Sequence, residues 1–153
     1  MPAVLFVCTG NRSRSPIAAA SFEKELVDRG LLDNWRVSSA GSWAEAGLPL
    51  SADAAASAAR LGLDLSSHLS KAITLDSVDE ADVILVMEQG QKEALQIEFA
   101  AAGAKVHLLS EVATGSSYDV PDPISPASAA EIHAEIADLV HRGFDRIYAL
   151  AEG

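Results

Sequence analysis

Cysteine is almost absent from this chain: Cys8 is the only one among 153 residues. A single cysteine excludes an internal disulfide. With one cysteine and four scattered histidines, the sequence offers no ligand spacing typical of zinc, and we expect no metal. A reactive thiol survives best in a reducing compartment, so we expect a cytoplasmic protein.

Basic residues and long apolar runs are also scarce. Lysine and arginine number 11 against 22 acidic residues, which gives a net charge of -11. Nucleic acids and anionic membrane surfaces require a basic face, so we expect neither as a partner. No apolar run reaches the length of a membrane span, and the start lacks the basic stretch and cleavage site of a signal peptide. The length predicts one domain, residues 1–153.

Apolar runs of strand length alternate with helical patterns along the chain. The expected strands are Ala3–Cys8, Trp35–Ser39, Asp82–Met87 and Lys105–Leu109. The expected helices lie near Pro16–Arg29, Ala52–Leu61, Leu75–Val78, Gln89–Ala101 and Ser128–Leu150. This alternation predicts an α/β fold, in which crossover helices connect the strands of a parallel sheet. In such sheets, ligands bind at the carboxyl ends of the strands.

Residues 8–15, Cys-Thr-Gly-Asn-Arg-Ser-Arg-Ser, directly follow the first expected strand, and we call them the anion loop. Five residues separate Cys8 from Arg14, a spacing that lets backbone amides surround a tetrahedral anion while the guanidinium binds two of its oxygens. Ser15 suits a helix N-cap and Pro16 the first helical position. The positive end of that helix would then face both the anion and the Cys8 thiol, which we expect to be a thiolate.

The alternative interpretation of this stretch is structural. Cys8 would be a buried cysteine at a strand end, as most free cysteines are. Arg12 and Arg14 would then lie on a surface turn. The joint placement of cysteine, glycine, arginine, serine and proline between a strand and a helix favours the anion cradle instead.

The long loop after the fourth expected strand contains a candidate general acid. Two prolines bracket Asp122 and restrict its backbone, as an acid held above a site requires. A turn aspartate before a proline is an equally common loop device. Asp119, three residues earlier, is the rival acid.

The chain resembles the low-molecular-weight protein tyrosine phosphatases over nearly its whole length. The resemblance rests on Leu5 to Asn11, Arg14-Ser15-Pro16, Ser39-Ala40-Gly41 and Asp122-Pro123. It implies a single-domain four-stranded parallel sheet in the order 2-1-3-4, with helices on both faces and no metal or organic cofactor.

The same resemblance implies a mechanism. Cys8 would attack phosphorus to form a thiophosphate, Arg14 would hold the phosphate, and Asp122 would protonate the leaving group. The substrate would be a phosphorylated protein or a small phosphate ester of the phosphotyrosine type. The implied substrate-binding residues are Thr9, Gly10, Asn11, Arg12, Ser13, Ser15 and Trp43, and Ser39 and His68 would support the loop. A phosphate or sulfate anion is expected in the loop.

Departures from the family pattern concern the loop and its surroundings. Ser13 stands where many members have a second cysteine that protects the nucleophile by a reversible disulfide, so Cys8 is expected to oxidise more readily. Arg12 replaces a small aliphatic residue or threonine. Lys71 stands where an arginine is frequent.

The expected aromatic slot is also altered. Ile124 and Ser125 follow the Asp-Pro pair, where tyrosine-directed members often carry aromatic residues. Trp43 is a candidate for the other wall of the slot. Packing of this tryptophan on its own domain is the alternative.

Three other functions remain open on the same residues. The stretch Val112 to Ser116 resembles the bacterial arginine-phosphatase branch, but Arg12 would repel a guanidinium. Arsenate reduction on this fold usually needs two further cysteines, which the chain lacks. A non-catalytic phosphate-binding module is the third, although Cys8, Arg14 and Asp122 are all present.

Overall fold

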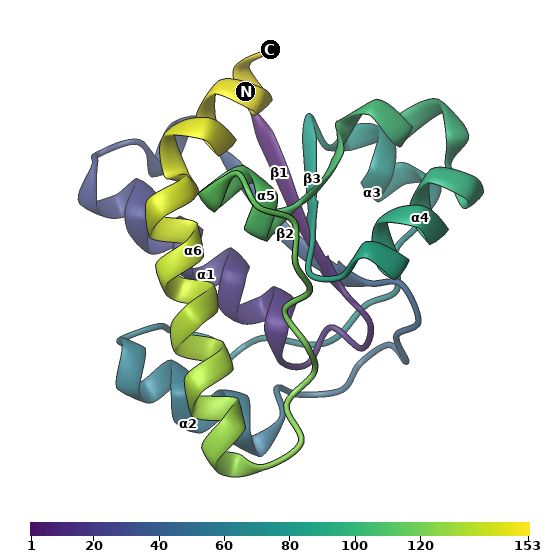
Figure 1. The fold of residues 1–153 in the computed structure, drawn as a ribbon. Helices are drawn as coiled ribbons and strands as arrows, with labels where there is room; N and C mark the ends of the chain where they lie inside the picture. Colours follow the sequence, from purple (N-terminus) through teal and green to yellow (C-terminus); the bar gives the residue numbers. More distant parts are fainter.

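The computed structural model describes all 153 residues and contains one four-stranded parallel sheet. The strands are β1 (Ala3–Cys8), β2 (Arg36–Gly41), β3 (Val83–Val86) and β4 (Val106–Leu108). Their order, β2-β1-β3-β4, confirms the order that the resemblance implied (Figure 1). The helices are α1 (Arg14–Asp28), α2 (Ala52–Leu61), α3 (Leu75–Glu80), α4 (Gln89–Glu98), α5 (Leu109–Thr114) and α6 (Pro126–Glu152), with short 3-10 helices at Leu32–Asn34 and Ala100–Lys105.

Helices cover both faces of the sheet, which explains why every residue of β1 is apolar and buried. Val4 and Phe6 belong to the larger core, which the sheet shares with α1, α2, α5 and α6. Leu5 and Val7 point to the smaller core, beneath α3 and α4. Figure 1 shows α6 in yellow crossing the first face, while α3 and α4 lie on the other. No helix combines the length and the hydropathy that a membrane span requires.

The start of α1 differs from the prediction. Ser13, not Ser15, is the N-cap, and the helix begins at Arg14. Ser15 therefore lies in the first turn, and its hydroxyl contacts Cys8 instead of capping the helix. Pro16 is tolerated in this first turn because the amides there have no intrahelical acceptor.

Other element boundaries also differ from the prediction, and two of them have a clear cause. Residues predicted as a strand end and a loop form α5, in which Leu109 and Val112, three residues apart, are buried on one side. Helix α6 begins at Pro126, two residues before the predicted start, because Ser125 caps it and accepts a hydrogen bond from the Ser128 amide.

The strand register places the anion loop beside the loops that follow β2 and β3. Cys8 pairs with Gly41, and Val7 pairs with Val86. Because parallel strands end at the same edge, the loops after β2 and β3 meet the anion loop, although all three are distant in sequence.

Candidate active site

Cys8 is the last residue of β1 and is buried at the base of the anion loop. Its Sγ lies 3.0 Å from the hydroxyl of Ser15 and 3.4 Å from the amide of Ser15, in the first turn of α1. Both groups and the positive end of α1 therefore face the sulfur.

Asn11 holds the loop in its curved shape. It is buried and has φ of 56°, a left-handed conformation that asparagine tolerates better than most residues. Its side-chain amide donates to the hydroxyls of Ser15 and Ser39, each at 2.9 Å, and its Oδ1 accepts from the Lys71 amide at 3.0 Å.

These bonds also determine where the proton of Ser15 points. The Lys71 amide identifies Oδ1 of Asn11 as the acceptor, so the other end of the Asn11 side chain donates to Ser15. The Ser15 hydroxyl then keeps its own hydrogen for the sulfur of Cys8 at 3.0 Å, a shorter contact than the 3.5 Å to the Ala40 carbonyl.

The end of β2 and a segment that follows it complete the support of the loop. His68 Nε2 lies 2.7 Å from the Asn11 carbonyl, so His68 contacts the loop. Gly41 passes very close to the loop, since an added Cβ would lie 2.5 Å from the Thr9 carbonyl oxygen. A residue larger than glycine does not fit there without moving the backbone.

Arg14 is the largest fully buried side chain of the site. Its Nη1 donates to the carboxylate of Glu88 and, at 2.8 Å, to the Val120 carbonyl. Its Nε is buried without a hydrogen-bond partner and lies 3.7 Å from Oδ1 of Asp122. The guanidinium is thus fixed on one edge, while Nε retains an unused donor.

The two candidate acids, Asp119 and Asp122, both lie on the loop before α6 but have different partners. Val120 is buried and its amide donates to the Met87 carbonyl at 2.8 Å, which anchors the loop to the end of β3. Asp119 accepts a hydrogen bond from the Gln89 amide at 2.8 Å. Asp122 is 74% exposed and is the carboxylate near Nε of Arg14.

The rim of the site contains a polar hollow and two exposed apolar residues. A hollow of about 260 Å³ is lined by Gly10, Arg12, Ser13, Ser51, Asp53, Asp122 and Pro123. Arg12 Nε donates to the Pro49 carbonyl at 2.8 Å. The Trp43 amide donates to the Thr9 carbonyl at 3.0 Å, yet its side chain is 86% exposed, so packing on its own domain is excluded. Ile124 is also exposed.

Sequence reasoning missed three residues whose side chains hydrogen-bond to the loop. Glu88 and Gln91 come from the end of β3 and the first turn of α4, and Gln91 donates to the Thr9 hydroxyl at 3.0 Å. His133 of α6 lies 2.6 Å from the Ser13 hydroxyl. Glu88 follows an expected strand end, which is a usable signal; His133 has no signal, because it lies in the middle of a long helix.

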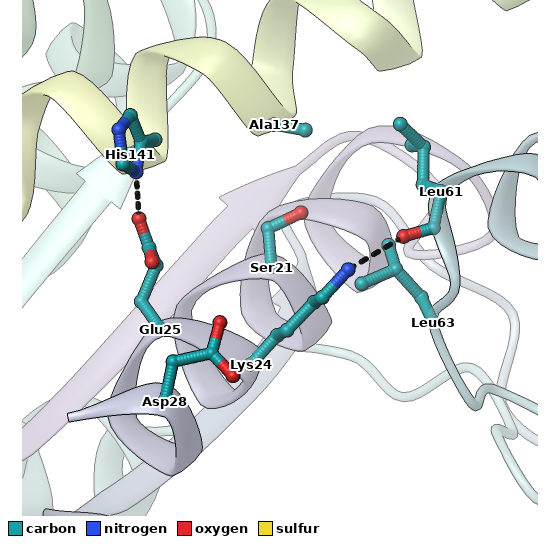
Figure 2. A pocket seen from close by; sticks show the side chains of 8 residues that line it. All are labelled: Ser21, Lys24, Glu25, Asp28, Leu61, Leu63, Ala137 and His141. Carbon is teal, nitrogen blue, oxygen red and sulfur yellow. Dashed lines mark hydrogen bonds and ion pairs between the residues drawn. The ribbon is translucent and has the colours of Figure 1, made fainter.

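Another hollow lies away from this loop. The hollow in Figure 2 is formed by α1, α6 and the end of α2. It contains a hydrogen bond between His141 and Glu25 and another from Lys24 to the Leu61 carbonyl. It shares no residue with the anion loop. The structure contains no group of three or more His, Cys, Asp or Glu side chains able to hold a metal ion.

Comparisons with known proteins agree with this geometry. The family "Low molecular weight phosphotyrosine protein phosphatase" matches residues 3–151. A probable low molecular weight protein-tyrosine-phosphatase, EpsP from Ralstonia nicotianae, is 32% identical over 142 residues, 93% of this chain and 90% of that protein.

Solved structures are similar over the same extent. A crystal structure of a YwlE mutant from Bacillus subtilis has a TM-score of 0.89 at 31% identity and covers 97% of this chain and 99% of that one. A structure of the YwlE arginine phosphatase, a cysteine-to-serine mutant with a phosphorylated active-site serine, has a TM-score of 0.86 at 31% identity and covers 92% and 91%. Sequence and fold agree, and the chain belongs to the low molecular weight phosphotyrosine protein phosphatase family.

Proposed function

We propose that the protein is a cysteine-dependent phosphatase that hydrolyses phosphomonoesters of the phosphotyrosine type, with Cys8 as nucleophile, Arg14 as phosphate ligand and Asp122 as general acid. The observation that carries the proposal is the state of Arg14. A buried guanidinium whose Nε has no hydrogen-bond partner, on the loop that begins with a buried cysteine, is suited to bind an anion directly above the sulfur.

In the first step, the Cys8 sulfur attacks phosphorus in line with the ester oxygen. The S–P bond forms as the P–O bond to the leaving group breaks, and Asp122 donates its proton to the departing oxygen. The hydroxyl and amide of Ser15 stabilise the sulfur before attack. The loop amides and Arg14 stabilise charge on the equatorial oxygens.

In the second step, water attacks the phosphorus of the thiophosphate. Asp122, now ionised, accepts a proton from this water, and the S–P bond breaks to return the Cys8 thiolate and release phosphate. Asp122 is exposed at the rim, where it can reach both the leaving group and the incoming water. The phosphorylated serine in the YwlE mutant supports a covalent intermediate in this family.

Two substitutions at one position test the covalent step. Cys8→Ser and Cys8→Ala are expected to abolish turnover of nitrophenyl phosphate, because neither supplies a thiolate. Both should still bind inorganic phosphate in calorimetry, because Arg14 and the loop amides remain. The wild type should be exposed briefly to substrate and then quenched with acid. Its intact mass should show one added phosphoryl group, which we expect on Cys8.

The outcomes separate an enzyme from a phosphate-binding module. Phosphate binding by the wild-type protein without any turnover would establish the module. Turnover by Cys8→Ala near the wild-type rate would exclude Cys8 as nucleophile.

Phosphoarginine is the second candidate substrate. It is favoured by the similarity to the YwlE arginine phosphatase and by the polar hollow, in which the carboxylates of Asp53 and Asp122 lie beside the anion loop. Arg12 opposes a guanidinium leaving group at the same rim. The exposed side chain of Trp43 favours an aromatic leaving group, and the phosphotyrosine type is therefore preferred. The cytoplasm is the proposed location, since it keeps a lone reactive cysteine reduced.

A further inference from the structure

His133 is a fully buried histidine that the proposed mechanism does not use. It lies on the face of α6 that packs against the sheet and α2. Both of its ring nitrogens contact a serine hydroxyl. Nε2 lies 2.6 Å from Oγ of Ser13, and Nδ1 lies 2.7 Å from Oγ of Ser57.

The contact with Ser13 connects His133 to the anion loop. Ser13 directly precedes Arg14 and is the N-cap of α1, yet its hydroxyl does not cap the helix. That hydroxyl is directed to His133 instead. A side chain of α6, 120 residues away in sequence, therefore contacts the anion loop at the residue before Arg14.

The second contact fixes the orientation of the imidazole. Ser57 of α2 also accepts a hydrogen bond from Arg60 at 3.1 Å. A neutral imidazole has one donor and one acceptor nitrogen, which two hydroxyls satisfy completely. Burial lowers the pKa of His133, and the charges that face it are Asp53, Arg60 and Asp122. At neutral pH the ring is thus uncharged.

We propose that His133 is a positioning residue of the phosphatase site: through Ser13 it fixes the backbone of the anion loop next to Arg14, and through Ser57 it is itself fixed by α2. The inference rests on the proposed function, because its consequence for catalysis requires that residues 8–15 bind the phosphate group. It assigns a role to a side chain that does not touch the substrate.

The test compares two substitutions of His133 that each restore one of its two serine contacts with a third that restores neither. Glutamine places its polar end near the position of Nε2 and can reach Ser13, whereas asparagine places it near Nδ1 and can reach only Ser57. We expect kcat/KM for nitrophenyl phosphate to fall about tenfold in His133→Leu and His133→Asn, the equivalent of one buried hydrogen bond. His133→Gln should stay within about threefold of the wild type.

A double-mutant cycle identifies the partner. Ser13→Ala should lower kcat/KM as much as His133→Leu does, and the double variant should be no worse than either, because each change removes the same contact. The loss should appear in KM and in phosphate binding, since the loop amides are displaced. Ile136→Val, a core change on the same helix, should lower the Tm and leave kcat/KM unchanged.

The results distinguish this inference from the proposed function. Additive losses in the double variant, or equal losses in His133→Gln and His133→Asn, would overturn the positioning role while leaving the phosphatase intact. If the wild type hydrolyses no aryl phosphate, inorganic phosphate binding measured by calorimetry in the same variants still tests the positioning role, because the same pattern is expected in Kd. Wild-type phosphate binding in His133→Leu would overturn it.

Discussion

Asp119 caps α4: its carboxylate accepts a hydrogen bond of 2.8 Å from the backbone amide of Gln89, the first residue of that helix. A carboxylate at this position stabilises the positive end of a helix. Asp119 therefore has a structural partner, whereas Asp122 lies 3.7 Å from the guanidinium of Arg14. This difference favours Asp122 over its rival as the general acid.

The first prediction concerns leaving groups. Asp122→Asn should slow hydrolysis of phenyl phosphate by ~10²–10⁴-fold, because phenolate is a poor leaving group without a proton. Nitrophenyl phosphate should be affected much less. Asp119→Asn is the matched control and should keep the wild-type ratio of the two rates. A steep dependence in Asp119→Asn, with none in Asp122→Asn, would reverse the assignment.

Arg14→Lys tests the planar guanidinium. Lysine supplies a point charge but cannot reach Glu88, the Val120 carbonyl and a phosphate oxygen at once. We expect kcat/KM to fall by ~10²–10³-fold, comparable to the loss of an oxyanion donor. Arg36→Lys, at an exposed position of β2, is the control for the substitution itself. Circular dichroism should show that both variants are folded, and normal kinetics in Arg14→Lys would be inconsistent with binding by two nitrogens.

Glu88→Gln separates charge from orientation. The substitution keeps the shape of the side chain but removes the carboxylate that orients Nη1 of Arg14. Phosphate binding should not weaken, because the site loses a negative charge, while kcat should fall about tenfold as the guanidinium becomes less ordered. The measurements are kcat and the inhibition constant of inorganic phosphate. Glu93→Gln on the exposed side of α4 should change neither quantity, and an unchanged kcat in Glu88→Gln would refute the orienting role.

Arg12→Thr tests selectivity at the rim. The Arg12 side chain is tied to the Pro49 carbonyl and lines the polar hollow beside Asp122. Its loss should leave nitrophenyl phosphate turnover within about tenfold, a change of roughly 1.4 kcal/mol or less in the barrier. The ratio of phosphotyrosine to phosphoarginine hydrolysis should fall, because a cation that repels guanidinium has been removed. An unchanged ratio would eliminate the role of the rim charge.

Gly41→Ala tests the close approach of β2 to the anion loop. The added Cβ would lie 2.5 Å from the Thr9 carbonyl oxygen and 2.6 Å from Cβ of Ala44, so the backbone must shift. We expect the free energy of unfolding to fall by about 2 kcal/mol, as in other overpacked positions, and KM to rise. Gly103→Ala is the control, since its added Cβ would meet only Gln96 at 3.7 Å. Equal stability of the two variants in thermal unfolding would show that the loop adjusts freely.

The local part of the site was readable from the sequence. Cys8, Arg14 and Asn11 lie within one strand–loop–helix unit, whose geometry follows from short-range backbone preferences and fixed spacing. The alternation of apolar strands and amphipathic helices likewise predicted a parallel sheet, and the resemblance supplied its order. The N-cap at Ser15 was predicted wrongly, because capping preferences take no account of the sulfur that competes for its hydroxyl.

The supporting contacts were decided by the tertiary structure alone. Glu88 reaches Arg14 across 74 residues because β3 pairs with β1 in register, and His133 reaches Ser13 across 120 residues because α6 packs back over α1 and α2. Side-chain periodicity identifies a buried helix face but not which residue on it meets a given loop. The sequence by itself determined the strand, the anion loop and the helix that follows it. The burial of Arg14, the contact of Asp119 with α4 and the contact of His133 with Ser13 required the packed molecule, because each depends on distances between segments that no local preference controls.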